Sequence, residues 1–144
     1  MLILLDANIL IYSANPSSPN YIDCMTAPNF IRLRGDMPCI VPQSLYEFWT
    51  VATRPVDKKG LGMLPAQAHI EIAGIKSHFQ LIPDNAAIYP EWESLVTQLG
   101  VSGATAHDAR YVAAMNVHGI THLLTYNKDH FKRFPITALL PTEL

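Results

Sequence analysis

Apolar and polar residues alternate in blocks along this chain, and the blocks predict strands separated by helices. Apolar residues recur at helical spacing in four segments: 42–53, 65–77, a stretch from Trp92 to Leu99, and 105–118. Short apolar runs between them are typical of strands buried on both faces: 2–5, 38–41, 79–82, 121–125 and 136–140. This alternation predicts an α/β, three-layer sandwich with a mainly parallel sheet of four to five strands flanked by helices.

Prolines and glycines mark the ends of the predicted helices. Pro42 and Pro65 stand at first helical positions, where the missing amide hydrogen costs little. Gly100 and Gly119 follow the last apolar residues of the two later helices, where glycine commonly ends a helix. Residues 54–65 are rich in Gly, Pro and Lys and predict an exposed loop. The buried face of the helix at 42–53 is predicted to hold Leu45, Phe48, Trp49 and Ala52.

Composition indicates one compact domain over residues 1–144, with 49% hydrophobic and 15% charged residues. The formal net charge of −2 gives no general attraction to nucleic acid, so such a partner requires a local basic patch or a cation. Cys24 and Cys39 match no metal-binding pattern and predict reduced thiols. We see neither a membrane-spanning stretch nor a signal-peptide pattern and expect a cytoplasmic protein without membrane contact.

Asp6 interrupts the first apolar run at the point where the predicted strand ends. In open α/β sheets the ligand crevice lies beyond the carboxyl ends of the strands, so Asp6 is expected to face a cleft. The structural alternative is an Asx-type turn tethered by Asn8. Asn127 follows a later strand and is expected at the same rim, with a cap on the next short helix as its alternative.

Two further acids lie on predicted helices, and each has a purely structural alternative. Glu47 belongs to the polar stripe of the helix at 42–53, which also contains Gln43, Thr50 and Arg54. A solvated helix face would give the same pattern. Asp108 stands three residues after Thr105, the spacing of a capping box, so it could instead satisfy backbone amides at the start of its helix.

Four segments, spread over nearly the whole chain, hold these acids. They are LLDANIL with Asp6, PQSLYEFW with Glu47, AHDARYVAAM with Asp108, and LLTYNKDHF with Asn127 and Asp129. Together they resemble the PIN domain, and within it the VapC-type ribonuclease toxins of toxin-antitoxin pairs. The resemblance implies a parallel sheet flanked by helices, with acids meeting at one rim to hold Mg²⁺ or Mn²⁺.

The same resemblance implies a role for each acid. Asp6, Glu47, Asp108 and Asn127 match catalytic positions, and Asp6, Asp108 and Glu47 match metal ligands. Many relatives carry an aspartate where this chain has Asn127, so Asp129 or an RNA phosphate would complete a second metal shell. Crowded carboxylates repel one another, and a hard divalent ion resolves that conflict.

The implied activity is that of a metal-dependent endoribonuclease that hydrolyses RNA phosphodiester bonds and acts as a toxin. The implied partners are an RNA substrate, a small cognate antitoxin protein and a second copy in a homodimer. Arg54, Lys58 and Lys59 are candidates for contacts with the RNA backbone, with ordinary surface charges as the alternative.

Other classes of function remain open from the sequence. A non-catalytic RNA- or protein-binding module could keep the fold with a weakened site, an option to which Asn127 gives weight. Aspartyl phosphatases and dehalogenases also place an aspartate after a first strand, but such phosphatases usually carry a second aspartate where this chain has Asn8. A phosphorylation-dependent receiver domain would require an acidic pair near its first strand and a lysine near its last.

Overall fold

A five-stranded parallel sheet forms the centre of the protein in a computed structural model that describes residues 1–144. The strands are β1 (Leu2–Leu5), β2 (Met37–Ile40), β3 (Gln80–Leu81), β4 (His122–Leu124) and β5 (Thr137–Leu139). They lie in the order β3-β2-β1-β4-β5, and every neighbouring pair is parallel. The predicted α/β class with its parallel sheet is confirmed, and the receiver-domain alternative is excluded because that fold orders its strands about as 2-1-3-4-5.

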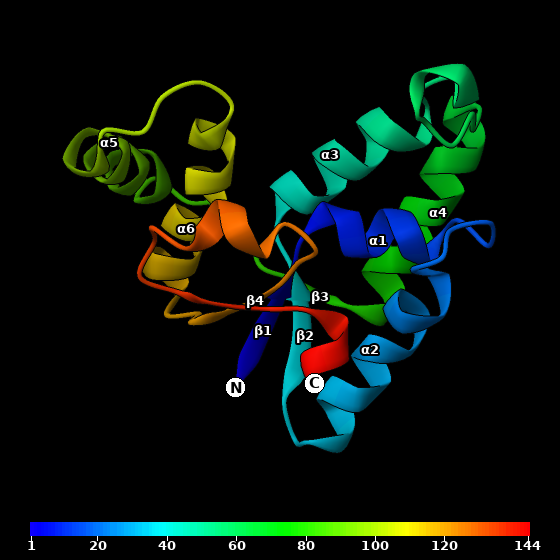
Figure 1. Cartoon of the computed structure of the whole chain (residues 1–144), viewed down its shortest axis with the longest axis horizontal. Coiled ribbons are helices and arrows are strands. Elements are labelled where there is room, and N and C mark those ends of the chain that lie inside the picture. Colours follow the sequence, from blue (N-terminus) through cyan, green and yellow to red (C-terminus); the bar gives the residue numbers. More distant parts are fainter.

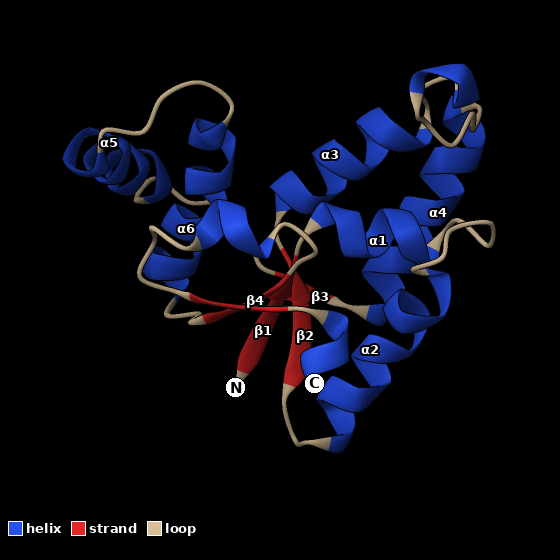
Figure 2. Cartoon of the chain, in the orientation of Figure 1, coloured by secondary structure: helices blue, strands red, loops and turns tan.

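Helices cover both faces of the sheet, as Figure 1 and Figure 2 show. They are α1 (Ala7–Ser13), α2 (Tyr21–Leu33), α3 (Pro42–Ala52), α4 (Pro65–His78), α5 (Ile88–Leu99) and α6 (Thr105–His118). Three short 3₁₀ helices are also present: η1 (Val56–Lys58), η2 (Lys128–Phe131) and η3 (Pro141–Glu143). Helices α5 and α6 lie on one side and α1 to α4 on the other. No helix has the length and apolar character that crossing a membrane requires.

The core consists of two apolar clusters separated by the sheet. Leu4 of β1 belongs to the cluster under α5 and α6, whereas Ile3 and Leu5 belong to the cluster under α1, α2 and α3. Successive strand residues point to opposite faces, and this explains why β1 is apolar throughout. The strand is therefore fixed from both sides, and so is the residue that follows it.

The predicted helix ends are confirmed where proline or glycine marks them. Gly100 and Gly119 follow α5 and α6 with φ of 60° and 69°, the left-handed conformation that glycine adopts without strain. The sequence did not predict α1 and α2. Trp49 was predicted on the buried face of α3 and is 36% exposed, so that assignment was wrong. The helix turns Trp49 away from the side that Phe48 and Ala52 bury.

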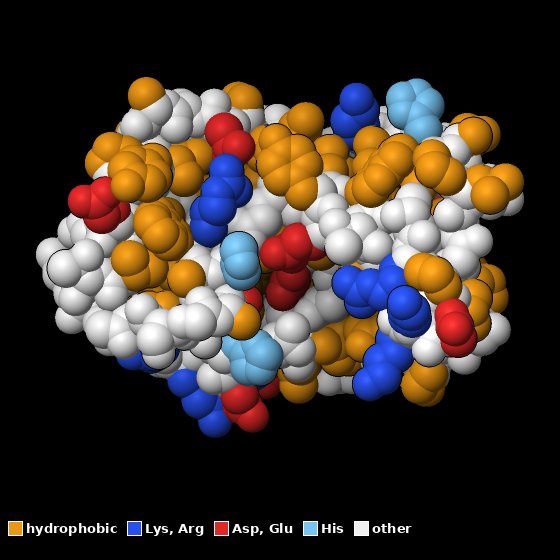
Figure 3. Space-filling model, turned by 90° about the horizontal axis from the view of Figure 1, so that it is seen from above, with side chains coloured by type: hydrophobic (Ala, Val, Ile, Leu, Met, Phe, Trp, Pro, Cys, Tyr) orange, Lys and Arg blue, Asp and Glu red, His pale blue; other side chains and the backbone are white.

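Because all strands run in one direction, their carboxyl ends share one edge of the sheet. The amide of Asp6 donates to the carbonyl oxygen of Leu124 at 3.0 Å, and the amide of Thr125 donates to that of Leu139 at 2.9 Å. These bonds extend the pairing of β1, β4 and β5 by one residue. They place Asp6 and Thr125 beside each other at this edge, which is the face seen in Figure 3.

Candidate active site

Asp6 is a buried carboxylate at the junction of β1 and α1, and it is 5% exposed. The hydroxyl of Thr125 donates to Asp6 Oδ2 at 2.7 Å, and Asn8 Nδ2 donates to the same oxygen at 3.4 Å. The predicted tether to Asn8 is therefore present, beside the shorter bond from Thr125. Burial raises the pKa of Asp6 to about 6, and the negative charges of Glu47 and Asp108 add to that rise.

Glu47 is held on α3 by two donors, one for each carboxylate oxygen. The hydroxyl of Tyr111 donates to Oε2 at 2.7 Å, and Gln43 Nε2 donates to Oε1 at 3.0 Å. Tyr111 is itself buried on α6, where its oxygen also accepts from the amide of Ala7 at 3.3 Å. The alternative of a solvated helix face is therefore wrong for Glu47, because α1 packs against α3 and residues of α6 form hydrogen bonds with this part of it.

Asp108 lies in the first turn of α6, and the capping-box alternative is wrong. The helix includes Thr105 as its first residue, and its cap position, Ala104, makes no side-chain bond. The carboxylate of Asp108 instead lies 3.6 Å from His130 Nδ1. Partial burial raises its pKa most, the charge of Glu47 raises it further, and the nearby His130 partly offsets the rise.

A cavity of about 310 Å³ opens beside the buried carboxylate. Its polar lining consists of Asp6, Asn8, Glu47, Thr50, Arg54 and Asn127. Figure 3 shows acidic side chains in a hollow at the centre of this face, with histidines on one side and basic side chains on the other. The structure thus brings together four residues that the sequence assigned to the site, namely Asp6, Glu47, Arg54 and Asn127. Asp108 lies within electrostatic reach but does not line this cavity.

The donor set fits a hard divalent cation, although no three His, Cys, Asp or Glu side chains converge closely enough to hold one by themselves. Mg²⁺ usually keeps several waters and takes one or two carboxylates from the protein. Asp6 and Glu47 both line the cavity and supply such a pair. Both side-chain hydrogen bonds to Asp6 end on Oδ2, which leaves Oδ1 for a cation, and each oxygen of Glu47 keeps a second lone pair beside its hydrogen bond. Burial is the main cause of the raised pKa values of Asp6 and Asp108, and the charge of Glu47 adds to both, so a bound cation would stabilise the ionised carboxylates.

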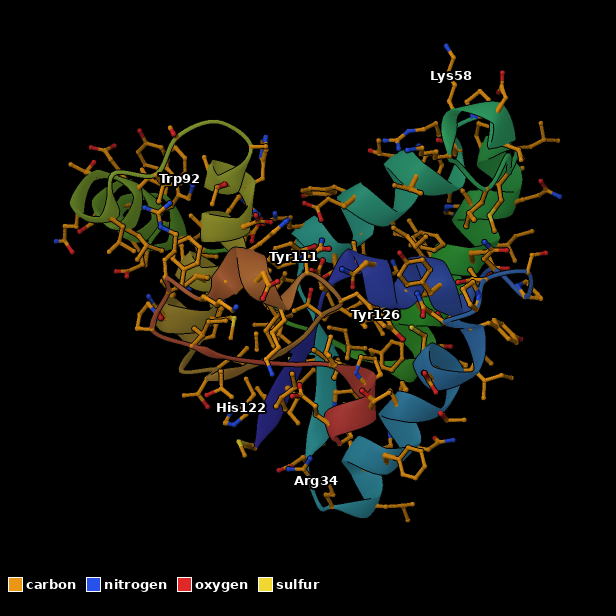
Figure 4. All side chains as sticks on the ribbon, viewed as in Figure 1. Arg34, Lys58, Trp92, Tyr111, His122 and Tyr126 are labelled. Carbon is orange, nitrogen blue, oxygen red and sulfur yellow. The ribbon has the colours of Figure 1, made fainter.

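Three other candidates lie outside the cavity. Asp129 is 82% exposed and pairs with Lys132 at 2.8 Å, which holds the pKa of Asp129 below its usual range. Lys58 points into solvent beyond the end of α3, as Figure 4 shows, and Lys59 follows it on the same exposed loop. Their predicted roles in metal and RNA binding stay predictions, and the geometry gives them no direct contact with Asp6.

Asn127 reaches the cavity from the loop after β4. Its backbone amide donates to Thr125 Oγ1 at 2.9 Å, and its backbone carbonyl oxygen accepts from the backbone amide of His130 at 2.9 Å. Asn127 stands at the cap position of η2, but its side chain forms no capping bond, so the capping alternative is wrong; the residue instead lines the cavity.

The sequence did not predict Tyr111 or Thr125 as site residues, and it placed Gln43 only on the polar stripe of α3. Tyr111 looks like an ordinary core residue of α6, and its polar end becomes significant only when α3 is packed against it. Thr125 gave a weak signal, since it directly follows an apolar strand, as Asp6 does.

Comparison with solved structures identifies the class of fold. The chain is similar to VapBC2 from Rickettsia felis bound to a DNA fragment from its promoter, with 21% identity, a TM-score of 0.70, and coverage of 97% of this chain and 98% of that one. It is similar to VapBC-1 from nontypeable Haemophilus influenzae, with 18% identity, a TM-score of 0.68 and 99% of both chains covered.

A third similar structure is VapC20 from Mycobacterium tuberculosis, a Sarcin-Ricin loop cleaving toxin. Here the identity is 17%, the TM-score 0.62, and the coverage 89% of this chain and 92% of that one. At such identities the likeness establishes the fold, and the predicted PIN-like fold is confirmed. No family model matches the sequence, and a search of curated proteins found no match.

Proposed function

We propose that this protein is a Mg²⁺- or Mn²⁺-dependent endoribonuclease that hydrolyses RNA phosphodiester bonds. One observation carries the proposal: the buried carboxylate of Asp6 shares an open cavity with Glu47 at the carboxyl edge of a PIN-like sheet. The charge of a carboxylate buried at this position destabilises the fold unless a cation or substrate compensates for the charge. A structural role therefore does not explain why an aspartate stands here.

Each polar residue has a task that follows from its contacts. Asp6 and Glu47 would hold the cation from one wall of the cavity, and Asp108 would complete its surroundings from the start of α6. When bound, the cation supplies Lewis-acid chemistry on the scissile phosphodiester. Thr125, Asn8, Tyr111 and Gln43 fix the orientations of the acids. Arg54 lies on the cavity wall, where its charge is placed for an RNA phosphate.

The proposal is tested with end-labelled total tRNA and ribosomal RNA, incubated with purified protein in Mg²⁺, Mn²⁺ or EDTA. We expect cuts at discrete positions in either metal and none in EDTA. Asp6→Asn and Asp108→Asn should abolish cleavage, whereas Asp57→Asn should cleave like the unaltered protein. Asp57 is a suitable control because it is an exposed carboxylate on η1, outside the cavity.

Two results would overturn this proposal. One is cleavage that persists in EDTA or in the folded Asp6→Asn and Asp108→Asn proteins. The other is intact RNA in every lane with a folded protein, which would favour the binding module suggested by Asn127. An aspartyl phosphatase would instead release phosphate from a phosphomonoester and lose that activity in Asp6→Asn.

We further propose that the nuclease acts as the toxin of a toxin-antitoxin pair. The likeness to the VapBC complexes over nearly the whole chain supports this, as does a neighbour described as a Toxin-antitoxin complex from Klebsiella pneumoniae. A small antitoxin would cover the acid cavity and present a basic group to Asp6 and Glu47. A homodimer is expected as well, and size-exclusion chromatography with light scattering measures it.

Induced expression in a bacterial host tests the toxin proposal separately from the chemistry. The unaltered protein should arrest growth, and Asp6→Asn at equal protein level should not. Normal growth, with a protein that cleaves RNA after purification, would indicate housekeeping RNA processing instead.

A further inference from the structure

A second cavity, of about 480 Å³, lies between α5, the loop before it and the first turns of α6. Its lining includes Asp84, Asn85, Tyr89, Trp92, His107 and Arg110. The acid cavity shares none of these residues. The combination of two aromatic rings with several polar side chains at an open pocket requires an explanation beyond the packing of α5 on α6.

The two aromatic residues offer flat surfaces, and a hydrogen bond holds one of them in place. Trp92 Nε1 donates to the carbonyl oxygen of Ala106 at 2.8 Å, which fixes the plane of the indole against α6. The centroids of the Tyr89 and Trp92 rings lie 5.9 Å apart, and the interplanar angle is 33°. Tyr89 is 65% exposed, far more than a core residue. Figure 4 shows Trp92 between the ribbons of α5 and α6.

Polar groups at the rim supply both donors and acceptors. Arg110 Nη2 donates to Asp84 Oδ2 at 3.0 Å, and Arg110 Nη1 donates to Gln43 Oε1 at 3.3 Å. The guanidinium is therefore held in one orientation beside a carboxylate. Flat π-surfaces combined with a donor and an acceptor are the features that proteins use to hold an unpaired base.

One buried side chain, Gln43, joins this pocket to the acid cavity. Its Nε2 donates to Glu47 Oε1 at 3.0 Å and to the carbonyl oxygen of His107 at 2.8 Å, while its Oε1 accepts from Arg110. The pocket thus lies on the opposite side of Gln43 from Glu47. In Figure 3, hydrophobic side chains gather on the α5 side of the face, and a basic and a histidine side chain separate them from the acidic hollow.

We propose that this pocket, defined by Tyr89, Trp92, Asp84 and Arg110, binds one unstacked nucleobase of the substrate next to the scissile phosphate. It thereby selects single-stranded or looped RNA and decides which phosphodiester reaches the acids. The proposal rests on the ribonuclease function proposed above, because it names how that same site chooses its substrate.

Fluorescence of Trp92 reports directly on the pocket. The chain has two tryptophans, so Trp49→Phe leaves Trp92 as the sole tryptophan, whose emission is excited at wavelengths that tyrosine does not absorb. A short single-stranded oligoribonucleotide that contains a mapped cut site, added in EDTA, should quench this emission. The same oligonucleotide with an abasic residue beside the cut should quench far less, because the phosphates remain and the base is absent. If the protein cuts no RNA, a mixed-sequence oligonucleotide and its fully abasic counterpart serve as the pair.

Substitutions provide the second readout. Tyr89→Ala should weaken binding of the oligonucleotide by about 10-fold, as the loss of one base–aromatic stack does. Trp92→Phe keeps an aromatic surface and should retain most of the affinity. Phe30→Ala is the matched control, since Phe30 is an aromatic residue of α2 that is 52% exposed and lies outside the pocket. It should bind like the unaltered protein.

The outcomes separate this inference from the proposed function. Suppose that RNA is cut in a metal-dependent way, that saturating RNA leaves Trp92 emission unchanged, and that Tyr89→Ala cuts the same positions at the same rate. The base pocket is then refuted, and the proposed nuclease activity is supported. If RNA is never cut, yet quenches Trp92 in a base-dependent manner, the pocket stands and the nuclease proposal fails.

Discussion

Replacing Asp6 with asparagine should stabilise the metal-free protein at neutral pH, although it should abolish activity. Asparagine has nearly the same shape and keeps an acceptor for the Thr125 hydroxyl. It removes the charge that burial disfavours and that Glu47 and Asp108 repel. The substitution therefore separates what Asp6 costs the fold from what it contributes to the site.

The size of the effect follows from the pKa of Asp6, which is raised from 3.8 to about 6 in the folded protein. The folded state holds the Asp6 proton more tightly than the unfolded state, so stability falls as pH rises through the interval between these values. At about 1.4 kcal/mol per pKa unit, ionisation of Asp6 costs about 3 kcal/mol above pH 7 and almost nothing below pH 4. For a chain of this length the gain corresponds to on the order of 10 °C in melting temperature.

Urea denaturation in EDTA, followed by circular dichroism from pH 4 to pH 7.5, measures this difference. The free energy of unfolding of Asp6→Asn should exceed that of the unaltered protein by about 3 kcal/mol at pH 7.5, and the difference should disappear toward pH 4. Asp57→Asn, which removes an exposed charge, should show no such trend. If the difference in the free energy of unfolding is absent at pH 7.5, or stays constant with pH, then the charge of Asp6 does not destabilise the fold and the reasoning is refuted.

Other substitutions and probes test the surroundings of the site. Tyr111→Phe should lower the free energy of unfolding by about 1 to 3 kcal/mol in urea melts, because Glu47 loses a donor and a buried backbone amide loses its acceptor. Gly60→Ala should cost about 1 to 3 kcal/mol in the same assay, since the added methyl group would overlap the carbonyl oxygen of Arg54. Burial raises the pKa of Cys39 to about 12, so iodoacetamide at neutral pH should leave it unmodified in native protein and alkylate it in urea, as counted by mass spectrometry.

The central sheet was predictable because its strands are short, apolar and separated by helices with clear ends. Pro42, Pro65, Gly100 and Gly119 fixed those ends almost to the residue. Helices α1 and α2 were missed for physical reasons. The first begins directly at the end of β1 with no turn, and the second contains Pro28, a residue that normally argues against a helix interior.

The acids of the candidate site could be selected from the sequence as individual residues, but their contacts could not. Asp6 and Glu47 stand at positions where a parallel sheet and an amphipathic helix bring side chains to one rim. That Tyr111 contacts Glu47 depends on how the tertiary fold places α6 relative to α3, since the two residues are 64 positions apart in sequence. The structural alternatives for Glu47 and Asp108 were equally consistent with the sequence, because a helix face and a capping box are local patterns. Tertiary packing decided against both.

The net charge of −2 raised the question of how this protein could hold a polyanion, and the arrangement of its charges gives the answer. The negative charge that repels a phosphate is concentrated in the cavity of Asp6 and Glu47, which a divalent cation would neutralise locally. Arg54 lies on the wall of that cavity, and the fixed guanidinium of Arg110 lies beyond Gln43 on the other side. An RNA strand that crosses this face would therefore meet the charge of Arg54 on one side of the cation, and on the other side the guanidinium of Arg110, whose charge Asp84 partly neutralises. Binding in the presence of metal should then depend on two local contacts, and hardly on the overall charge of the protein.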